Sequence, residues 1–227
     1  MEKMNKKERL RELGLLRQTS CFEGFNNLAA YHIGAYECEH VSPYTKSAGN
    51  VNSLIVFVLQ DWASHESLSR DMDLEVAQHG YTLSQPTNVN LIDLLSRHFG
   101  LILSEVYVTN LFPFIKSGGD SANIPMRYLR QAARVFGIAQ IEIIRPAMVV
   151  SFGLQVFNAL RSEFGHRQVA NLKTGINNPF RTEFTEYRCQ SHPGALGKIN
   201  RNHRGSVEED WAAMASAFRN LAESEGP

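Results

Sequence analysis

No apolar stretch of this sequence is long enough to cross a membrane. The longest uninterrupted apolar run, "LIVFVL" at residues 54–59, falls far short of the roughly 20 residues that a membrane-spanning helix requires. The first residues, "MEKMNKKERLRELG", are charged and contain no apolar core of the kind found in a secretory signal. We therefore expect a cytoplasmic protein that has no membrane segment.

Cysteine is also scarce, and its scarcity excludes several kinds of site. Cys21, Cys38 and Cys189 are odd in number and widely spaced, which argues against a disulfide framework. Three cysteines are also too few for a four-cysteine zinc or iron–sulfur centre. We expect the protein to use no metal and no cofactor.

The chain has no excess of charge of either sign. Lys and Arg total 23 and Asp and Glu total 23, so the formal net charge is zero. No global field would attract a nucleic acid, and any such binding would depend on a local patch. Residues 198–204 provide one, because they hold Lys198, Arg201 and Arg204 directly before the acidic "VEED" at 207–210.

Short apolar or β-branched segments alternate with helical patterns along most of the chain. The expected strands are residues 53–59, 105–110, 147–152 and 186–191, and the expected helices are 5–17, 90–100, 125–144, 154–165 and a last one from 206. The first three strand segments are almost continuously hydrophobic, as are strands buried on both faces of a parallel sheet. The pattern predicts an α/β fold: a three-layer α/β/α sandwich with a central, mostly parallel four-stranded sheet.

The length of 227 residues suits one hydrophobic core better than two. We find no repeat and no low-complexity linker that would mark a domain boundary. The chain is therefore expected to be a monomer with a single domain over residues 1–227, in which residues 1–50 form an N-terminal helical and loop extension.

Polar residues follow several of the expected strands. Gln60 and Asp61 come after the first, Asn110 ends the second and His192 follows the last. Ligands of parallel sheets bind outside the carboxyl ends of the strands, which makes these residues candidates for a site. Each also has a structural explanation, since Asp caps turns, Asn satisfies loop backbone groups and a His-Pro pair is common in turns.

With these segments the chain resembles the uracil-DNA glycosylase superfamily over roughly residues 50–200. The first family motif, Gly-Gln-Asp-Pro or a related form, is matched by "LQDW" at 59–62. The asparagine that ends a later strand is matched by Asn110, and the final His-Pro-Ser motif by "HPGAL" at 192–196. The resemblance implies a hydrolase for DNA repair that removes uracil or a related damaged base from single- or double-stranded DNA.

The resemblance also implies roles for individual residues. Breaking a glycosidic bond builds positive charge on the sugar and negative charge on the departing base. Asp61 would be the carboxylate near the sugar, and His192 would donate a hydrogen bond to O2 of uracil. Asn110 would pair with O4 and N3–H of the base, with Gln60 beside it, and Tyr81 would stack on the base after it has left the duplex.

The loop that contains the final motif is expected to hold the DNA. Leu196 occupies the position of the leucine that family members push into the duplex, an apolar wedge that unstacks bases. Lys198, Arg201 and Arg204 would contact phosphates and give salt-dependent binding without sequence preference. The alternatives are a leucine folded back onto the body of the protein and an ordinary solvated basic face.

Three departures from the family pattern leave other functions open. Leu59 stands where the family has glycine and Trp62 replaces a small residue or proline, so we expect a pocket mouth that is reshaped or partly filled. Gly194 stands where the final motif has serine, which removes a hydroxyl that would contact phosphate. One alternative is a catalytically inactive relative that binds nucleic acid or a nucleotide. Another is an unrelated doubly wound hydrolase that acts on a small substrate through Asp61 and His192.

Overall fold

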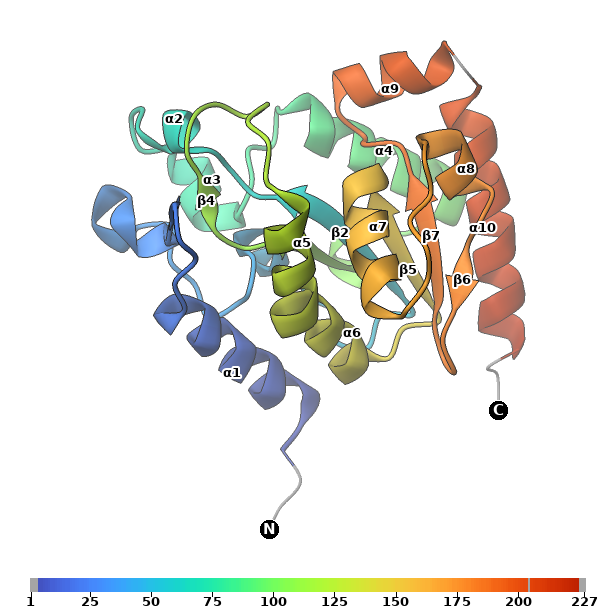
Figure 1. Ribbon diagram of the computed structural model, residues 1–227, viewed down its shortest axis with the longest axis horizontal. Coiled ribbons are helices and arrows are strands. Elements are labelled where there is room, and N and C mark those ends of the chain that lie inside the picture. The colour runs from blue at the N-terminus through green and yellow to red at the C-terminus, as the bar shows by residue number, and fades with distance from the viewer. Residues whose placement is uncertain (1–3, 204, 225–227) are drawn as a thin grey trace.

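The computed structural model describes residues 4–203 and 205–224, and four parallel strands form the centre of its main sheet (Figure 1). These strands are β2 (Ile55–Asp61), β3 (Tyr107–Phe112), β5 (Met148–Phe152) and β7 (Glu186–Gln190). A fifth strand, β6 (Phe180–Arg181), pairs antiparallel with β7 at the edge, so the order is β3-β2-β5-β7-β6. The expected count of four strands was wrong by one, because two residues carry too little pattern to indicate a strand.

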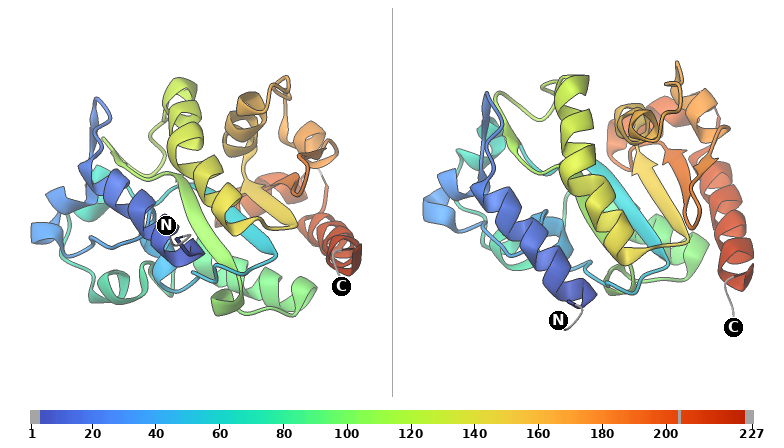
Figure 2. Two further views of the ribbon diagram at one scale, coloured as in Figure 1. Left: turned by 90° about the horizontal axis from the view of Figure 1, so that it is seen from below. Right: turned by 60° about the horizontal axis from the view of Figure 1, so that its bottom comes forward.

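Helices cover both faces of the sheet (Figure 2). One face packs against α1 (Lys6–Thr19), α5 (Met126–Ala132), α6 (Ile138–Ile144) and α7 (Leu154–Glu163), and the other against α4 (Pro86–Phe99) and α10 (Val207–Ser224). Short helices lie between them: α2 (His65–Leu68), α3 (Leu74–His79), α8 (Leu172–Ile176) and α9 (Ala195–Asn202). Across residues 4–203 and 205–224, no helix combines the length and the apolar character needed to cross a membrane.

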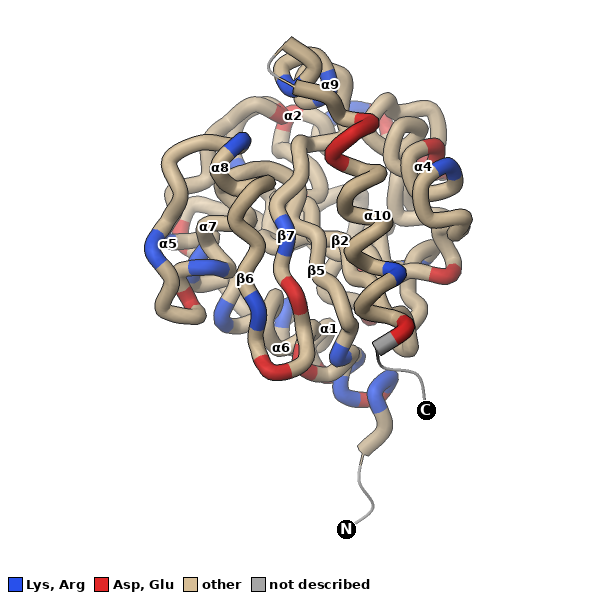
Figure 3. The backbone as a smooth tube through the Cα atoms, turned by 90° about the vertical axis from the view of Figure 1, so that its right-hand side faces the viewer, with Lys and Arg blue, Asp and Glu red and all other residues tan. Residues whose placement is uncertain are grey.

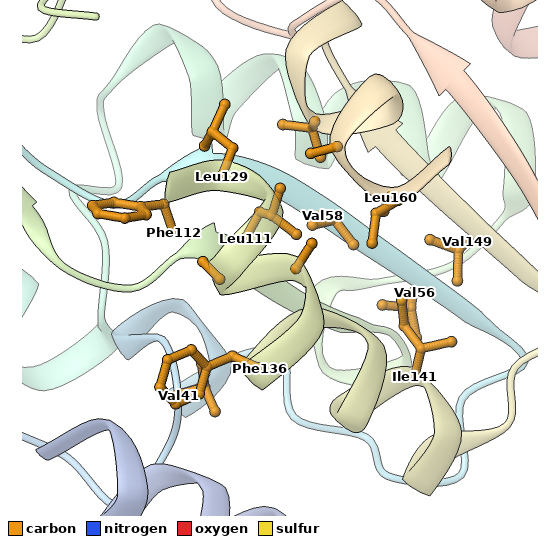
Figure 4. Close-up of a cluster of buried hydrophobic side chains, with 14 of the residues drawn as sticks. Val41, Val56, Val58, Leu111, Phe112, Leu129, Phe136, Ile141, Val149 and Leu160 are labelled. Carbon is orange, nitrogen blue, oxygen red and sulfur yellow. The ribbon is translucent and has the colours of Figure 1, made fainter. Parts of the chain in front are cut away.

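The central strands are buried on both faces, as their continuous hydrophobicity predicts. In β2, Val56 and Val58 point to the face covered by α5, α6 and α7, where they meet Ile141 and Leu160 (Figure 4). Phe57 of the same strand points to the opposite face and stacks near Trp211 of α10. Burying each such side chain contributes roughly 1.5–3 kcal/mol, so the sheet is a rigid base for the loops at its ends.

The helix expected over residues 125–144 is interrupted. A π-helical turn, η5 (Ala133–Gly137), separates α5 from α6. At Gly137 an added Cβ would lie 2.8 Å from Cδ1 of Leu111 on the sheet, so the lack of a side chain lets the helix approach closely. The helix ends at Ile144, before Arg145 in the left-handed conformation.

The N-terminal extension packs against the sheet. Within the extension, the buried guanidinium of Arg17 pairs with Glu37 and donates to the carbonyls of Cys38 and His40, which fastens α1 to the loop that follows it. A short turn, η3 (Pro43–Lys46), then lies against β3, and Thr45 in this turn donates to a carbonyl of that strand at 2.9 Å. The extension therefore brings its last residues to the carboxyl end of the sheet.

Part of the expected basic loop is a helix. Residues Ala195–Asn202 form α9, which starts three residues after His192. An added Cβ at Gly197 would lie 2.2 Å from the carbonyl oxygen of His192, so glycine is required for the chain to turn this tightly into the helix. The expectation of a continuous loop was wrong, because the apolar face of so short a helix consists of little more than Leu196 and Ile199.

Candidate active site

The carboxyl ends of three strands meet at one cavity. Asp61 is the last residue of β2, Asn110 on β3 lies opposite Leu59, and His192 follows β7 by two residues. All three line a single cavity of about 320 Å³, together with Gln60. This volume lies at the lower end of the roughly 300–1,000 Å³ typical of small-molecule sites.

The walls of the cavity are aromatic and its rim is acidic. Four aromatic side chains line it, and three further carboxylates belong to its lining: Tyr36, Tyr44, Trp62 and Tyr81, then Asp71, Asp73 and Asp120. Flat aromatic walls suit a planar ring, and an acidic rim disfavours an anion at the mouth. The cavity is therefore better suited to a neutral heterocycle than to a free phosphate.

Trp62 is part of the wall and does not close the cavity. Its indole Nε1 donates a hydrogen bond to the carbonyl of Gly80 at 2.7 Å, and its ring meets Tyr36 edge to face with 5.6 Å between centroids. It packs against the apolar cluster that includes Leu68 and Val76. These contacts hold the ring in the wall of the cavity, and the expectation of a mouth that Trp62 reshapes or partly fills stays a prediction.

Asp61 is oriented by two neighbours. Its Oδ2 lies 2.8 Å from Nζ of Lys116, and its Oδ1 accepts a hydrogen bond from Nε2 of Gln60 at 3.0 Å. The side chains of Lys116 and Asp61 are only 4% and 13% exposed, and Lys116 also donates to the carbonyl of Asp120. These two contacts hold the carboxylate in one position, and losing either member of the ion pair would leave a buried charge without its partner.

His192 is held as a neutral imidazole with a defined tautomer. Its Nδ1 accepts a hydrogen bond from the backbone N–H of Gly194 at 3.0 Å, so the neutral ring carries its proton on Nε2. Burial lowers the pKa of His192, an effect that Asp61 opposes and Lys116 reinforces. Nε2 has no partner within the described chain, which leaves an N–H donor available at the cavity that His192 lines.

Titration of His192 tests this electrostatic description. We expect a pKa below the ordinary value of about 6.5, because burial disfavours the imidazolium ion. Asp61→Asn should lower this pKa further, and Lys116→Met should raise it, since Asp61 favours the charged ring and Lys116 disfavours it. NMR of the imidazole C–H signals, assigned with His192→Gln, would measure all three values, and a wild-type pKa at or above 6.5 would contradict the description.

Asn110 belongs to the lining of the cavity and is almost completely buried. The hydroxyl of Ser42 lies 2.5 Å from Oδ1 of Asn110 and itself accepts the backbone N–H of Tyr44. Because the Ser42 oxygen already accepts, its proton is free to be donated to Oδ1, which fixes the orientation of the amide. Within residues 4–203 and 205–224, the side-chain hydrogen bond of Asn110 is the one that Oδ1 accepts from Ser42.

Tyr81 lines the cavity as part of a pair. Its ring stacks on Tyr44 with 4.8 Å between centroids and 11° between planes, and the Tyr44 hydroxyl donates to Oδ1 of Asn88. Burial raises the pKa of both tyrosines, so both hydroxyls stay protonated at neutral pH. The predicted role of Tyr81 as a stacking surface stays a prediction, and Tyr44 is a second candidate for it.

The residues predicted to bind DNA differ in their exposure and in their hydrogen-bond partners. Leu196 on α9 is 76% exposed, and the ammonium group of Lys198 donates a hydrogen bond to the amide oxygen of Asn90 at 3.1 Å. Arg201 is buried and forms a two-bond ion pair with Asp210 of α10, so its predicted contact with phosphate was wrong. Arg204 lies outside the described residues.

The surface around α9 is not uniformly basic. Figure 3 shows the acidic start of α10 beside the basic residues of α9. Arg201 and Asp210 join the two helices there, and Glu208 pairs with Arg97 on α4. Charge alone therefore gives this face little attraction for a nucleic acid, in line with the zero net charge of the chain.

Sequence reasoning missed Lys116, Ser42 and Tyr44. Lys116 lies in the two-residue strand β4 (Ile115–Lys116), which pairs with β1 (Phe25–Asn26) and not with the main sheet. Ser42 is 68 positions from Asn110 in the sequence. No local motif marks these residues. The fold of the N-terminal extension brings Ser42 and Tyr44 to the site, and Lys116 lies on β4, which pairs with β1 of that extension.

Comparison with models of known protein families and with curated proteins found no significant match to the chain. The function is therefore inferred from the chemistry of the cavity.

Proposed function

We propose that this protein is a DNA glycosylase that hydrolyses the N-glycosidic bond of uracil or a related base. One observation carries the proposal: Asp61 paired with Lys116, His192 with its Nδ1 bonded to Gly194, and Asn110 with its Oδ1 bonded to Ser42 line the same open cavity. The proposal includes a three-layer α/β/α arrangement, a monomeric state and a cytoplasmic location.

The geometry supports a hydrolytic mechanism without a covalent intermediate. A base extruded from the DNA would enter the cavity, and its sugar would lie at the mouth beside Asp61. As the bond between C1′ and the base nitrogen breaks, the carboxylate of Asp61 stabilises the positive charge on the sugar and orients a water molecule. The water oxygen bonds to C1′, and the departing base takes up the proton that the water releases.

Two donors would stabilise and identify the base. Nε2–H of His192 would donate to O2 of uracil, where negative charge develops as the base leaves. Nδ2 of Asn110 would donate to O4, a position where cytosine carries an amino group that cannot accept. Leu196 and Lys198 would contact the DNA beside the cavity, through an apolar wedge and a phosphate contact.

Strand scission at a single uracil tests the proposal. A labelled oligonucleotide with one deoxyuridine, incubated with the protein and then treated with alkali, should break at that position, and a matched deoxythymidine strand should stay intact. The same assay in single- and double-stranded form shows which substrate is preferred. Absence of any break on either form, with protein in excess, would contradict the proposal.

A second candidate is a catalytically inactive protein that uses the same cavity to bind a nucleobase or nucleotide. The observation that favours it is that both oxygens of Asp61 are already engaged, one by Lys116 and one by Gln60. Saturable, salt-dependent binding of the uracil strand without scission would support this candidate over the enzyme.

A further inference from the structure

Three consecutive residues of the N-terminal extension have left-handed backbone conformations. The φ angles of His32, Ile33 and Gly34 are 47°, 54° and 78°. A left-handed residue other than glycine is uncommon and usually stands alone, and a β-branched side chain such as that of isoleucine is especially crowded there. This left-handed turn over residues 32–34 is therefore strained. Backbone strain of this kind clusters at active sites, ligand clamps and switch regions.

The left-handed turn is held in place by the residues around it. Tyr31 before it and Tyr36 after it are both buried, and the backbone N–H of Gly34 donates to the carbonyl of Tyr31 at 2.9 Å. The imidazole Nε2 of His32 lies 2.9 Å from the carbonyl oxygen of Leu68. The same ring meets Tyr36 edge to face, with 5.4 Å between centroids. These contacts fix the backbone on both sides of the tip of the turn.

Ile33 at this tip is fully exposed. Its relative exposure of 106% is the highest among the large hydrophobic side chains of residues 4–203 and 205–224. Residues 28–36 contain no Lys, Arg, Asp or Glu, so a partner of this segment would be met through apolar contact and not through charge. A singly exposed isoleucine is ordinary, but a strained backbone that presents one is not. The combination indicates a binding contact.

The left-handed turn also borders the proposed active site. Leu68 and Tyr36, which contact His32, both line its cavity. In Figures 1 and 2 the blue segment that holds the turn lies toward one end of the molecule, and α9 with Leu196 lies toward the other. A DNA duplex with one base in the cavity would therefore extend past α9 in one direction and toward the turn in the other.

We propose that Ile33 is a second apolar residue that inserts into duplex DNA, on the side of the cavity away from α9. This inference rests on the proposed glycosylase function. An apolar side chain inserted between base pairs unstacks them, which favours extrusion of the neighbouring base. The left-handed turn holds Ile33 in one direction before the DNA arrives, so little conformational freedom is lost on binding.

Scission at one deoxyuridine, measured on a duplex and on the same strand alone, tests the inference. Ile33→Asn should lower kcat/KM on the duplex by about tenfold, the effect of losing one buried apolar contact. The single strand should be cut as before, because its base needs no unstacking. The tenfold loss should not vary with salt concentration, since an apolar side chain neutralises no phosphate.

Two further variants serve as controls. Ile33→Met keeps an apolar side chain at the tip and should retain most of the activity on the duplex. Ile102→Asn changes another exposed isoleucine, one whose φ is an ordinary −103°, and should alter neither rate.

Thermal unfolding separates this role from a structural one. Asparagine adopts a left-handed backbone more readily than isoleucine, so Ile33→Asn should raise Tm by about 2–4 °C while it lowers activity on the duplex. An equal loss on both forms of DNA, an unchanged rate on the duplex, or a wild-type protein that cuts single strands alone would overturn this inference and leave the glycosylase intact. No scission by the wild-type protein on either form would overturn both.

Discussion

Asp61→Asn is expected to lower kcat for scission at a preferred base by about 10³-fold. The substitution keeps the size of the side chain but removes the negative charge that stabilises the sugar cation and orients the water. Substrate binding should change far less, because Asn110 and His192 still hold the base. Single-turnover rates measured with protein in excess would separate the chemical step from binding.

A double variant controls for the buried ion pair. Asp61→Asn alone leaves Lys116 charged and nearly buried without its partner, which by itself costs stability by roughly 3–5 kcal/mol. Asp61→Asn combined with Lys116→Met removes both charges and should recover much of the thermal stability without recovering activity. Recovery of activity together with stability would show that Asp61 has only a structural role.

His192→Ala is expected to lower kcat by about 10²-fold, the usual cost of removing one donor from a developing negative charge. The effect should depend on how well the departing base carries that charge. A 5-halogenated uracil leaves as a more stable anion, so the loss caused by His192→Ala should shrink on that substrate.

This dependence separates a catalytic role from a structural one. A variant that only disturbs the turn at Gly194 would lose the same factor on every base. Equal losses on uracil and on its halogenated form would therefore contradict the assignment of His192 as the donor to the leaving group. Circular dichroism and thermal unfolding of the variant would check that its fold is intact.

Strands with long hydrophobic runs could be predicted from the sequence. The run at residues 54–59 and its two apolar counterparts indicated buried parallel strands, and these are β2, β3 and β5. Two-residue strands such as β6 carry no such pattern and are stabilised by pairing with a neighbour. Helix α9 was missed because Gly194 and Gly197 on either side of Leu196 suggested a glycine-rich loop.

The site could be predicted only in part. Asp61 ends β2, Asn110 lies two residues before the end of β3 and His192 follows β7, so the topology of a parallel sheet is enough to bring them to one edge. The residues that set their chemical state come from elsewhere in the chain: Lys116 beside Asp61 and Ser42 beside Asn110. Such long-range pairs depend on how the loops fold, which single-sequence patterns do not encode.

The most direct test of the account is a structure of the protein bound to DNA that contains a 2′-fluoro-2′-deoxyuridine. The fluorine disfavours positive charge on the sugar and so slows hydrolysis while leaving the base unchanged. The account predicts that the base lies in the cavity with O2 within hydrogen-bond distance of Nε2 of His192, O4 near Nδ2 of Asn110 and C1′ facing Asp61. A base that stays stacked in the DNA, or a DNA strand bound on another face of the protein, would contradict it.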